Sequence, residues 1–204
     1  MEQPNLLLAA GVLSVGMIAL AIILGWLGFC DTRQSLWSLD RNQVLFPALV
    51  WGIGASIPLL FLPFAILKFD FGLFQSLKQT IDDLLIPLFK ECPFAEIVLL
   101  SAFAGLSEEI FFRWCLQGGL TNVWAGNAGV WLGISIAGVL FGLCHFITVS
   151  YALFAALMGI YLGVVMQWSG TYLAPAIAHG LYDFVALSLV VHLGQNRGNR
   201  ELAG

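Results

Sequence analysis

The sequence predicts an all-α fold, a polytopic transmembrane helix bundle with about six spans and one amphipathic helix at the membrane interface. Of the 204 residues, 60% are hydrophobic and 10% are charged, whereas a soluble domain carries about 25% charged residues. The mean hydropathy is +0.92. The apolar runs are long and continuous, whereas the strands of a transmembrane barrel would alternate apolar and polar residues. The bilayer is therefore the expected solvent of this chain.

This composition excludes several classes of protein. A chain this apolar cannot cover its surface in water, so a soluble enzyme and a disordered chain are excluded. Eight scattered basic residues provide no basic stripe for phosphates, so no nucleic acid is expected as a partner. The four cysteines form no Cys-x-x-Cys pair and are expected to be free. They are Cys30, Cys92, Cys115 and Cys144.

Six apolar runs are long enough, or nearly so, to cross a bilayer. They cover residues 6–29, 44–67, 94–118, 128–149, 151–168 and 172–193. A polar link joins the first two runs, and Asn122 to Gly129 is expected to be a loop. The polar tail after Gly194 is expected to be frayed. We divide the chain into an N-terminal part (1–93), a catalytic core (94–193) and the tail (194–204).

Residues 68–93 differ from the spans. Apolar side chains recur at spacings of three and four, which predicts an amphipathic helix that ends near Pro87. These apolar residues are Leu73, Phe74, Leu77, Ile81, Leu84, Leu85 and Leu88. The helix either lies in the membrane interface or packs on the bundle as a connecting helix.

Six spans place both termini on one side of the membrane. Five basic residues are expected on that side, at positions 68, 78, 90, 197 and 200, and two on the other, at positions 33 and 41. Because basic residues favour the cytoplasmic side, we expect a multi-pass protein of the plasma membrane with cytoplasmic termini.

A few ionisable side chains lie inside the apolar runs, where an unpaired charge costs about 2.5–3.5 kcal/mol or more. They are Glu108, Glu109, Arg113, His145, His179 and Asp183. Glu109 and Arg113 are four residues apart, so their side chains lie on the same face of a helix. The same spacing places His179 and Asp183 on one face of their helix. Phe141 and His145 have the same spacing. Polar groups from three helices are therefore expected to converge on one buried pocket.

This set of residues fits a hydrolase that activates water. Glu108 is a candidate general base, because a carboxylate withdrawn from bulk water can take a proton from a bound water. The two imidazoles can bind a metal, hold a water or stabilise an oxyanion. Glu108, His145 and His179 also form a catalytic zinc set with one open position. Neither a Gly-x-Ser-x-Gly serine nor a His-Glu-x-x-His helix is present.

Two questions about these polar residues remain open. The first is whether the Glu109–Arg113 pair is a structural clamp or part of the catalytic machinery, and the second is whether the protein is a hydrolase or a transporter. A proton-relay transporter also places carboxylates and histidines in its spans.

Two Gly-x-x-x-Gly pairs, at Gly138/Gly142 and Gly159/Gly163, would let the fourth and fifth spans approach closely.

The polar residues stand in three motifs, and these motifs resemble one known family. They read Glu108-Glu109-Ile-Phe-Phe-Arg113, Phe141-Gly-Leu-Cys-His145 and His179-Gly-Leu-Tyr-Asp183. Their order and spacing are similar to those of the CPBP intramembrane proteases, also called the Abi or CAAX-protease family, which includes the type 2 CAAX prenyl endopeptidases. The similarity covers roughly residues 95–190.

The resemblance implies a membrane-embedded endopeptidase. Glu108 would activate the water, His145 would assist it and stabilise the oxyanion, and His179 with Asp183 would hold water or a metal. Glu109 and Arg113 would order the site. The family is labelled as metalloproteases, so zinc is one option, and a glutamate-activated water without metal is the other. The substrate would be a peptide or a prenylated protein. A non-catalytic bacteriocin-immunity or binding scaffold is the alternative function.

Overall fold

A computed structural model describes residues 5–30, 44–124 and 126–203 of the chain. All regular secondary structure in these residues is helical, and they contain no strand. The elements in chain order are α1 (Leu6–Trp26), α2 (Phe46–Lys68), α3 (Gly72–Thr80), η2 (Ile81–Leu85), α4 (Ile86–Phe89), α5 (Phe94–Glu109), η3 (Ile110–Gln117), α6 (Gly118–Val123), α7 (Gly126–Cys144), α8 (Val149–Ser169) and α9 (Leu173–Ala203). The segments η2 and η3 are π-helical. The predicted all-α bundle is confirmed.

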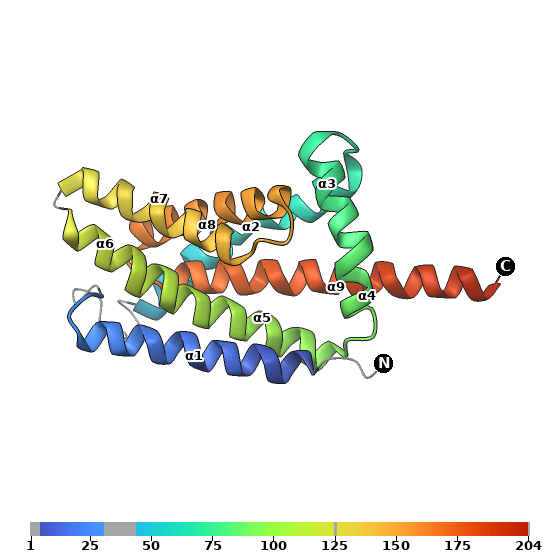
Figure 1. The fold of residues 1–204 in the computed structure, drawn as a ribbon, viewed down its shortest axis with the longest axis horizontal. Helices are drawn as coiled ribbons and strands as arrows, with labels where there is room; N and C mark the ends of the chain where they lie inside the picture. Colours follow the sequence, from blue (N-terminus) through green and yellow to red (C-terminus); the bar gives the residue numbers. More distant parts are fainter. Residues whose placement is uncertain (1–4, 31–43, 125, 204) are drawn as a thin grey trace.

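In the described residues, five helices are long and apolar enough to cross a membrane: α1, α2, α7, α8 and α9. They correspond to five of the six predicted spans. The remaining span was predicted over 94–118, where α5, η3 and α6 follow one another without a break. Figure 1 shows these three elements as one long rod beside α1. The π-helical turns of η3 divide this rod.

Helix α9 is the central element of the bundle. It packs against α2, α5 and α8, while α7 packs on α8 and α1 packs on α5 (Figure 1). Small residues permit these close approaches. A Cβ on Gly105 would lie 2.8 Å from the carbonyl oxygen of Ala176, on α9. The predicted close approach of α7 and α8 is also confirmed, because a Cβ on Gly138 would lie 2.8 Å from the backbone nitrogen of Ile160.

The amphipathic segment forms a helical run through α3, η2 and α4. It ends at Phe89, two residues after Pro87. Figure 1 shows the run standing across α9, at the end of the bundle where α1 begins and α9 ends. Leu77 and Ile86 are buried, and the run contacts α2, α8 and α9. The apolar stripe therefore packs on the bundle.

Several predicted helix ends are wrong. Helix α6 continues to Val123 and α7 begins at Gly126, so the predicted loop from Asn122 to Gly129 is much shorter. Helix α7 ends at Cys144, five residues before the predicted boundary. The tail is not frayed, because α9 continues to Ala203. The predicted polar link 31–43, with both basic residues of that side, lies outside the described residues.

The expectation of free cysteines is wrong for two of them. Cys30, just after α1, and Cys115, in η3, form a disulfide with their Cα atoms 4.2 Å apart. The two residues are 85 positions apart in sequence, so only the packing of α1 on η3 brings them together. Cys92 and Cys144 are free.

Candidate active site

The six predicted site residues come from three places in the bundle. Glu108 and Glu109 are the last two residues of α5, and Arg113 lies one turn further on in η3. His145 directly follows the last residue of α7. His179 and Asp183 lie one turn apart on α9. Because α9 packs against α5, and α7 packs on η3 and α8, these three places meet inside the bundle.

Glu109 is the centre of a buried ionic network. Its Oε2 accepts a hydrogen bond from Arg113 Nε at 2.7 Å, and neither side chain is exposed. Its Oε1 accepts a second bond from His179 Nδ1 at 3.0 Å. The predicted Glu109–Arg113 pair is thus present, and Glu109 also joins α5 to α9. A carboxylate with two such charge-assisted bonds has its charge compensated within the bundle.

His179 faces a carboxylate from each ring nitrogen. Nδ1 faces Glu109, and Nε2 lies 3.4 Å from Asp183 Oδ2. The predicted pairing of His179 with Asp183 is therefore present, although Glu109 makes the shorter contact. The two carboxylates fix the plane of the imidazole, which is itself buried.

Glu108 points to a different partner. Its Oε2 lies 3.6 Å from His145 Nε2. The same oxygen is buried and accepts no hydrogen bond from the described residues. Glu108 also interacts electrostatically with His179 and Asp183. A buried carboxylate oxygen with unused acceptor capacity is suited to hold a water.

His145 is held by the end of α7. Its Nδ1 donates a hydrogen bond of 2.8 Å to the carbonyl oxygen of Phe141. In a neutral imidazole with the proton on Nδ1, Nε2 is an acceptor. Glu108 Oε2 and His145 Nε2 are then two neighbouring acceptors, and one water can donate a hydrogen to each.

Phe141 packs between these polar groups. Its ring is stacked on His145 with 4.4 Å between centroids, and it meets His179 edge-on at 5.7 Å. The guanidinium carbon of Arg113 lies 5.3 Å from the centroid of the same ring. The predicted Phe141–His145 spacing thus orients the imidazole, and the aromatic ring separates the buried ionic network from His145.

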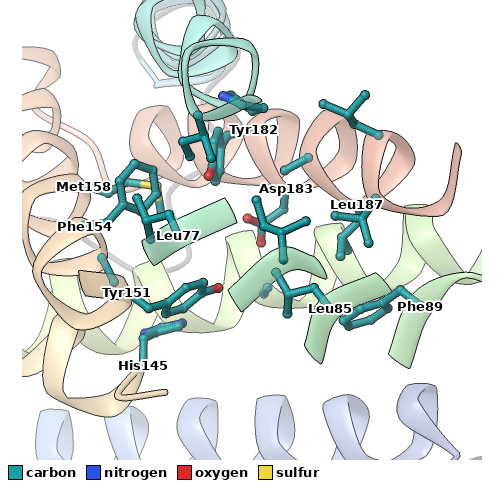
Figure 2. Close-up of a pocket in the computed structure, with 18 of the residues that line it drawn as sticks. Leu77, Leu85, Phe89, His145, Tyr151, Phe154, Met158, Tyr182, Asp183 and Leu187 are labelled. Atoms are coloured by element: carbon teal, nitrogen blue, oxygen red, sulfur yellow. The ribbon is translucent and has the colours of Figure 1, made fainter. Parts of the chain in front are cut away.

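His145, His179 and Asp183 line one cavity of about 290 Å³. Most of the other side chains around it are apolar and come from α1, α2, α5, α8, α9 and the amphipathic run. Figure 2 shows Leu77 and Leu85 of that run, with Leu187 of α9, lining this cavity. On α9 the lining extends from His179 to Leu193, about 21 Å at 1.5 Å per residue. The polar cluster therefore lies at one end of a long apolar chamber.

Sequence reasoning missed two tyrosines of this cavity. Tyr151, in the first turn of α8, and Tyr182, on α9, both line it. Tyr151 interacts electrostatically with Asp183 and Glu108. Neither tyrosine belongs to a charged pair, so no spacing rule selects them. Thr148, which caps α8 with its side chain, was the one sequence signal that a new helix, with Tyr151 in its first turn, begins shortly after His145.

The geometry does not gather the predicted zinc ligands. In the described residues, no group of three or more His, Cys, Asp or Glu side chains is arranged to hold a metal ion. The reason lies in His179, whose nitrogens face Glu109 and Asp183, while His145 Nδ1 is taken by Phe141. Glu108, His145 and His179 therefore do not fit a metal in this arrangement. Zinc binding by the protein stays a prediction.

Comparison with known proteins identifies one family. Residues 90–185 match the family described as Rce1-like, type II CAAX prenyl endopeptidase. The match covers slightly less than half of the chain and contains all three motifs. It confirms the resemblance inferred from Glu108 to Asp183. No curated protein and no solved structure matches the chain.

Proposed function

We propose that this protein cleaves a peptide bond with a water held by Glu108 and His145, because residues 90–185 match the Rce1-like family of type II CAAX prenyl endopeptidases. One observation carries the proposal. His145, His179 and Asp183 line one end of an apolar cavity. Glu108 comes from the end of α5, and its Oε2 lies 3.6 Å from His145 Nε2, so all four residues converge at that end. A bundle that needed only structural ion pairs would not require them there.

The reaction follows from the two acceptors. A water donates one hydrogen to Glu108 Oε2 and the other to His145 Nε2, so its oxygen lone pairs are free to attack. Glu108 takes a proton while the water oxygen bonds to the carbonyl carbon, and the C=O π pair moves onto the carbonyl oxygen. The tetrahedral intermediate collapses, the C–N bond breaks, and the leaving amine takes the proton from Glu108.

Glu109 and Arg113 act as positioning residues. Both side chains are fully buried, whereas the side chain of Glu108 is 15% exposed, so neither Glu109 nor Arg113 can touch the substrate. Glu109 instead fixes His179, which with Asp183 faces the cavity. Of the two roles open for this pair, we propose the structural one.

The cavity supports a substrate with an apolar group next to the cleaved bond. Its volume of about 290 Å³ lies near the lower end of the range for small-molecule sites, roughly 300–1,000 Å³. Its lining is mostly apolar along its length. A prenylated cysteine followed by a short peptide tail combines such a group with a scissile peptide bond. We therefore propose a prenylated peptide of the Cys-a-a-X type as substrate.

We also propose a plasma-membrane location with cytoplasmic termini. Helix α1 begins and α9 ends at the same end of the bundle (Figure 1). The charge distribution supports the cytoplasm for that end, because Lys68, Lys78 and Lys90 lie in or beside the amphipathic run. The Cys30–Cys115 disulfide supports the opposite end as the outer one, since disulfides persist in oxidising compartments.

The test is cleavage of a quenched fluorescent peptide ending in farnesyl-Cys-a-a-X by purified protein in lipid nanodiscs. We expect the wild type to cleave it. Glu108→Gln, which keeps the shape and removes the base, should be about 10²–10⁴-fold slower. Glu96→Gln is the matched control, because Glu96 lies in the first turn of the same helix α5, and it should keep the wild-type rate.

Two results would contradict the proposal. Equal cleavage by the wild type and Glu108→Gln would remove the mechanism. No cleavage by the wild type of either the farnesylated peptide or its unprenylated form would favour the non-catalytic scaffold.

A further inference from the structure

We propose that the Tyr151 hydroxyl donates the hydrogen bond that stabilises the developing oxyanion of the substrate. This inference rests on the proposed function and adds to it a residue outside all three motifs. The observation behind it is that Asp183 and the two histidines of the cavity accept hydrogen bonds or are already engaged in polar contacts, whereas the Tyr151 hydroxyl is free to donate.

The start of α8 fixes the position of Tyr151. Thr148 is the N-cap of this helix, and its Oγ1 accepts a hydrogen bond from the Tyr151 backbone nitrogen at 3.2 Å. The same Oγ1 lies 3.4 Å from the Thr80 hydroxyl of the amphipathic run. Thr148 therefore fixes the backbone at Tyr151, and Thr148 is itself held by Thr80 of the amphipathic run.

The side chain of Tyr151 lies in the cavity. Figure 2 shows it next to His145, with its hydroxyl directed into the space that Asp183 also faces. Its electrostatic interactions with Asp183 and Glu108 agree with this placement. Among the described residues, no hydrogen bond engages the Tyr151 hydroxyl, so its proton is available to a ligand.

The other cationic or donor groups of the site are unsuited to this task. Arg113 is fully buried and does not line the cavity. His179 faces a carboxylate from each nitrogen. His145 donates from Nδ1 to the backbone, which leaves Nε2 an acceptor in the neutral ring. Tyr182 stands apart from His145 in Figure 2.

The chemistry of the attack requires such a donor. When Glu108 takes the proton of the water, negative charge passes from Glu108 to the carbonyl oxygen of the substrate. Asp183 lies in the same cavity, so an oxyanion without a donor would meet a carboxylate. The Tyr151 O–H group donates a hydrogen bond to this oxygen and keeps its proton, and the collapse of the intermediate returns the oxygen to a carbonyl.

The first test compares Tyr151→Phe with Tyr161→Phe on the farnesylated peptide. Tyr161 lies on the same helix, and its hydroxyl donates to the Ala55 carbonyl at 2.8 Å, away from the cavity. We expect Tyr151→Phe to lower kcat by about 10²–10³-fold, as for loss of one oxyanion donor, with KM changed less than about threefold. Tyr161→Phe should keep the wild-type kcat.

The second test separates this role from a structural one. A peptide aldehyde, which binds as its tetrahedral hydrate, is compared with the corresponding alcohol. Tyr151→Phe should lose affinity for the aldehyde by about tenfold or more and keep its affinity for the alcohol. Equal loss for both ligands, or none for the aldehyde, would overturn the inference.

The outcomes distinguish the inference from the function beneath it. If the wild type cleaves, Glu108→Gln does not, and Tyr151→Phe keeps the wild-type kcat, only the role of Tyr151 is overturned. A raised KM at unchanged kcat also overturns it, because Tyr151 would then only bind substrate. If the wild type does not cleave at all, the proposed function fails, and the role of Tyr151 fails with it.

Discussion

Substitution of Arg113 by methionine tests the buried ionic network most sharply. Arg113 and Glu109 are both fully buried, and one hydrogen bond of 2.7 Å joins them. Methionine fills a similar volume and keeps an apolar contact with Phe141, whose ring the guanidinium now covers at 5.3 Å. The substitution therefore removes the positive charge and little else.

The expected loss of stability follows from the burial of the remaining carboxylate. Without Arg113, Glu109 keeps only His179 as a partner. Removing one member of a buried ion pair costs about 3–5 kcal/mol, because the other charge stays uncompensated. For a chain of this size, about 2–4 °C of Tm corresponds to each kcal/mol, so Tm should fall by about 6–20 °C.

The assay is thermal unfolding of purified protein in one detergent, followed by tryptophan fluorescence. The control is Lys78→Met, which removes an exposed ion pair with Asp70 and should cost about 0–1 kcal/mol. The double variant Arg113→Met with Glu109→Gln should recover most of the lost stability, since no buried charge is left unpaired. A Tm change in Arg113→Met as small as that in Lys78→Met would refute the reasoning.

Three further predictions concern packing, the disulfide and metal. Gly52→Ala should destabilise by about 1–3 kcal/mol, because its Cβ would lie 2.7 Å from a side-chain carbon of α9, whereas Gly54→Ala meets nothing within 4 Å and should be neutral by thermal unfolding. Cys30→Ala with Cys115→Ala should lower the unfolding free energy by about 2–5 kcal/mol, and Cys144→Ala, at a free and exposed cysteine, should not. Chelation with 1,10-phenanthroline should leave peptide cleavage unchanged; loss of cleavage that added zinc restores would establish the metal mechanism.

The sequence predicted the contacts that lie within one helix. Spacing of four residues gave Glu109–Arg113 and His179–Asp183, and both pairs are present. It could not give the bond from Glu109 to His179, because that contact depends on how α5 packs on α9. The neighbouring positions 108 and 109 thus have different roles that only the tertiary structure separates.

The predicted helix end at 149 was wrong for a physical reason. The run continues with apolar residues past Cys144, and hydropathy alone does not register a break between two apolar helices. The break is set by Thr148, which caps α8. This break between α7 and α8 places His145 at the end of α7 and the polar cluster at one end of the cavity. The π-helical turns at Arg113 likewise could not be predicted from the hydrophobic pattern.

The paired measurement of binding and cleavage by Glu108→Gln tests the central claim most directly. The variant is reconstituted in nanodiscs, the dissociation constant of the farnesylated peptide is measured by fluorescence anisotropy, and the single-turnover cleavage rate is measured on the same sample. The account predicts affinity within about threefold of the wild type and cleavage at least about 10²-fold slower. Cleavage at the wild-type rate would contradict it.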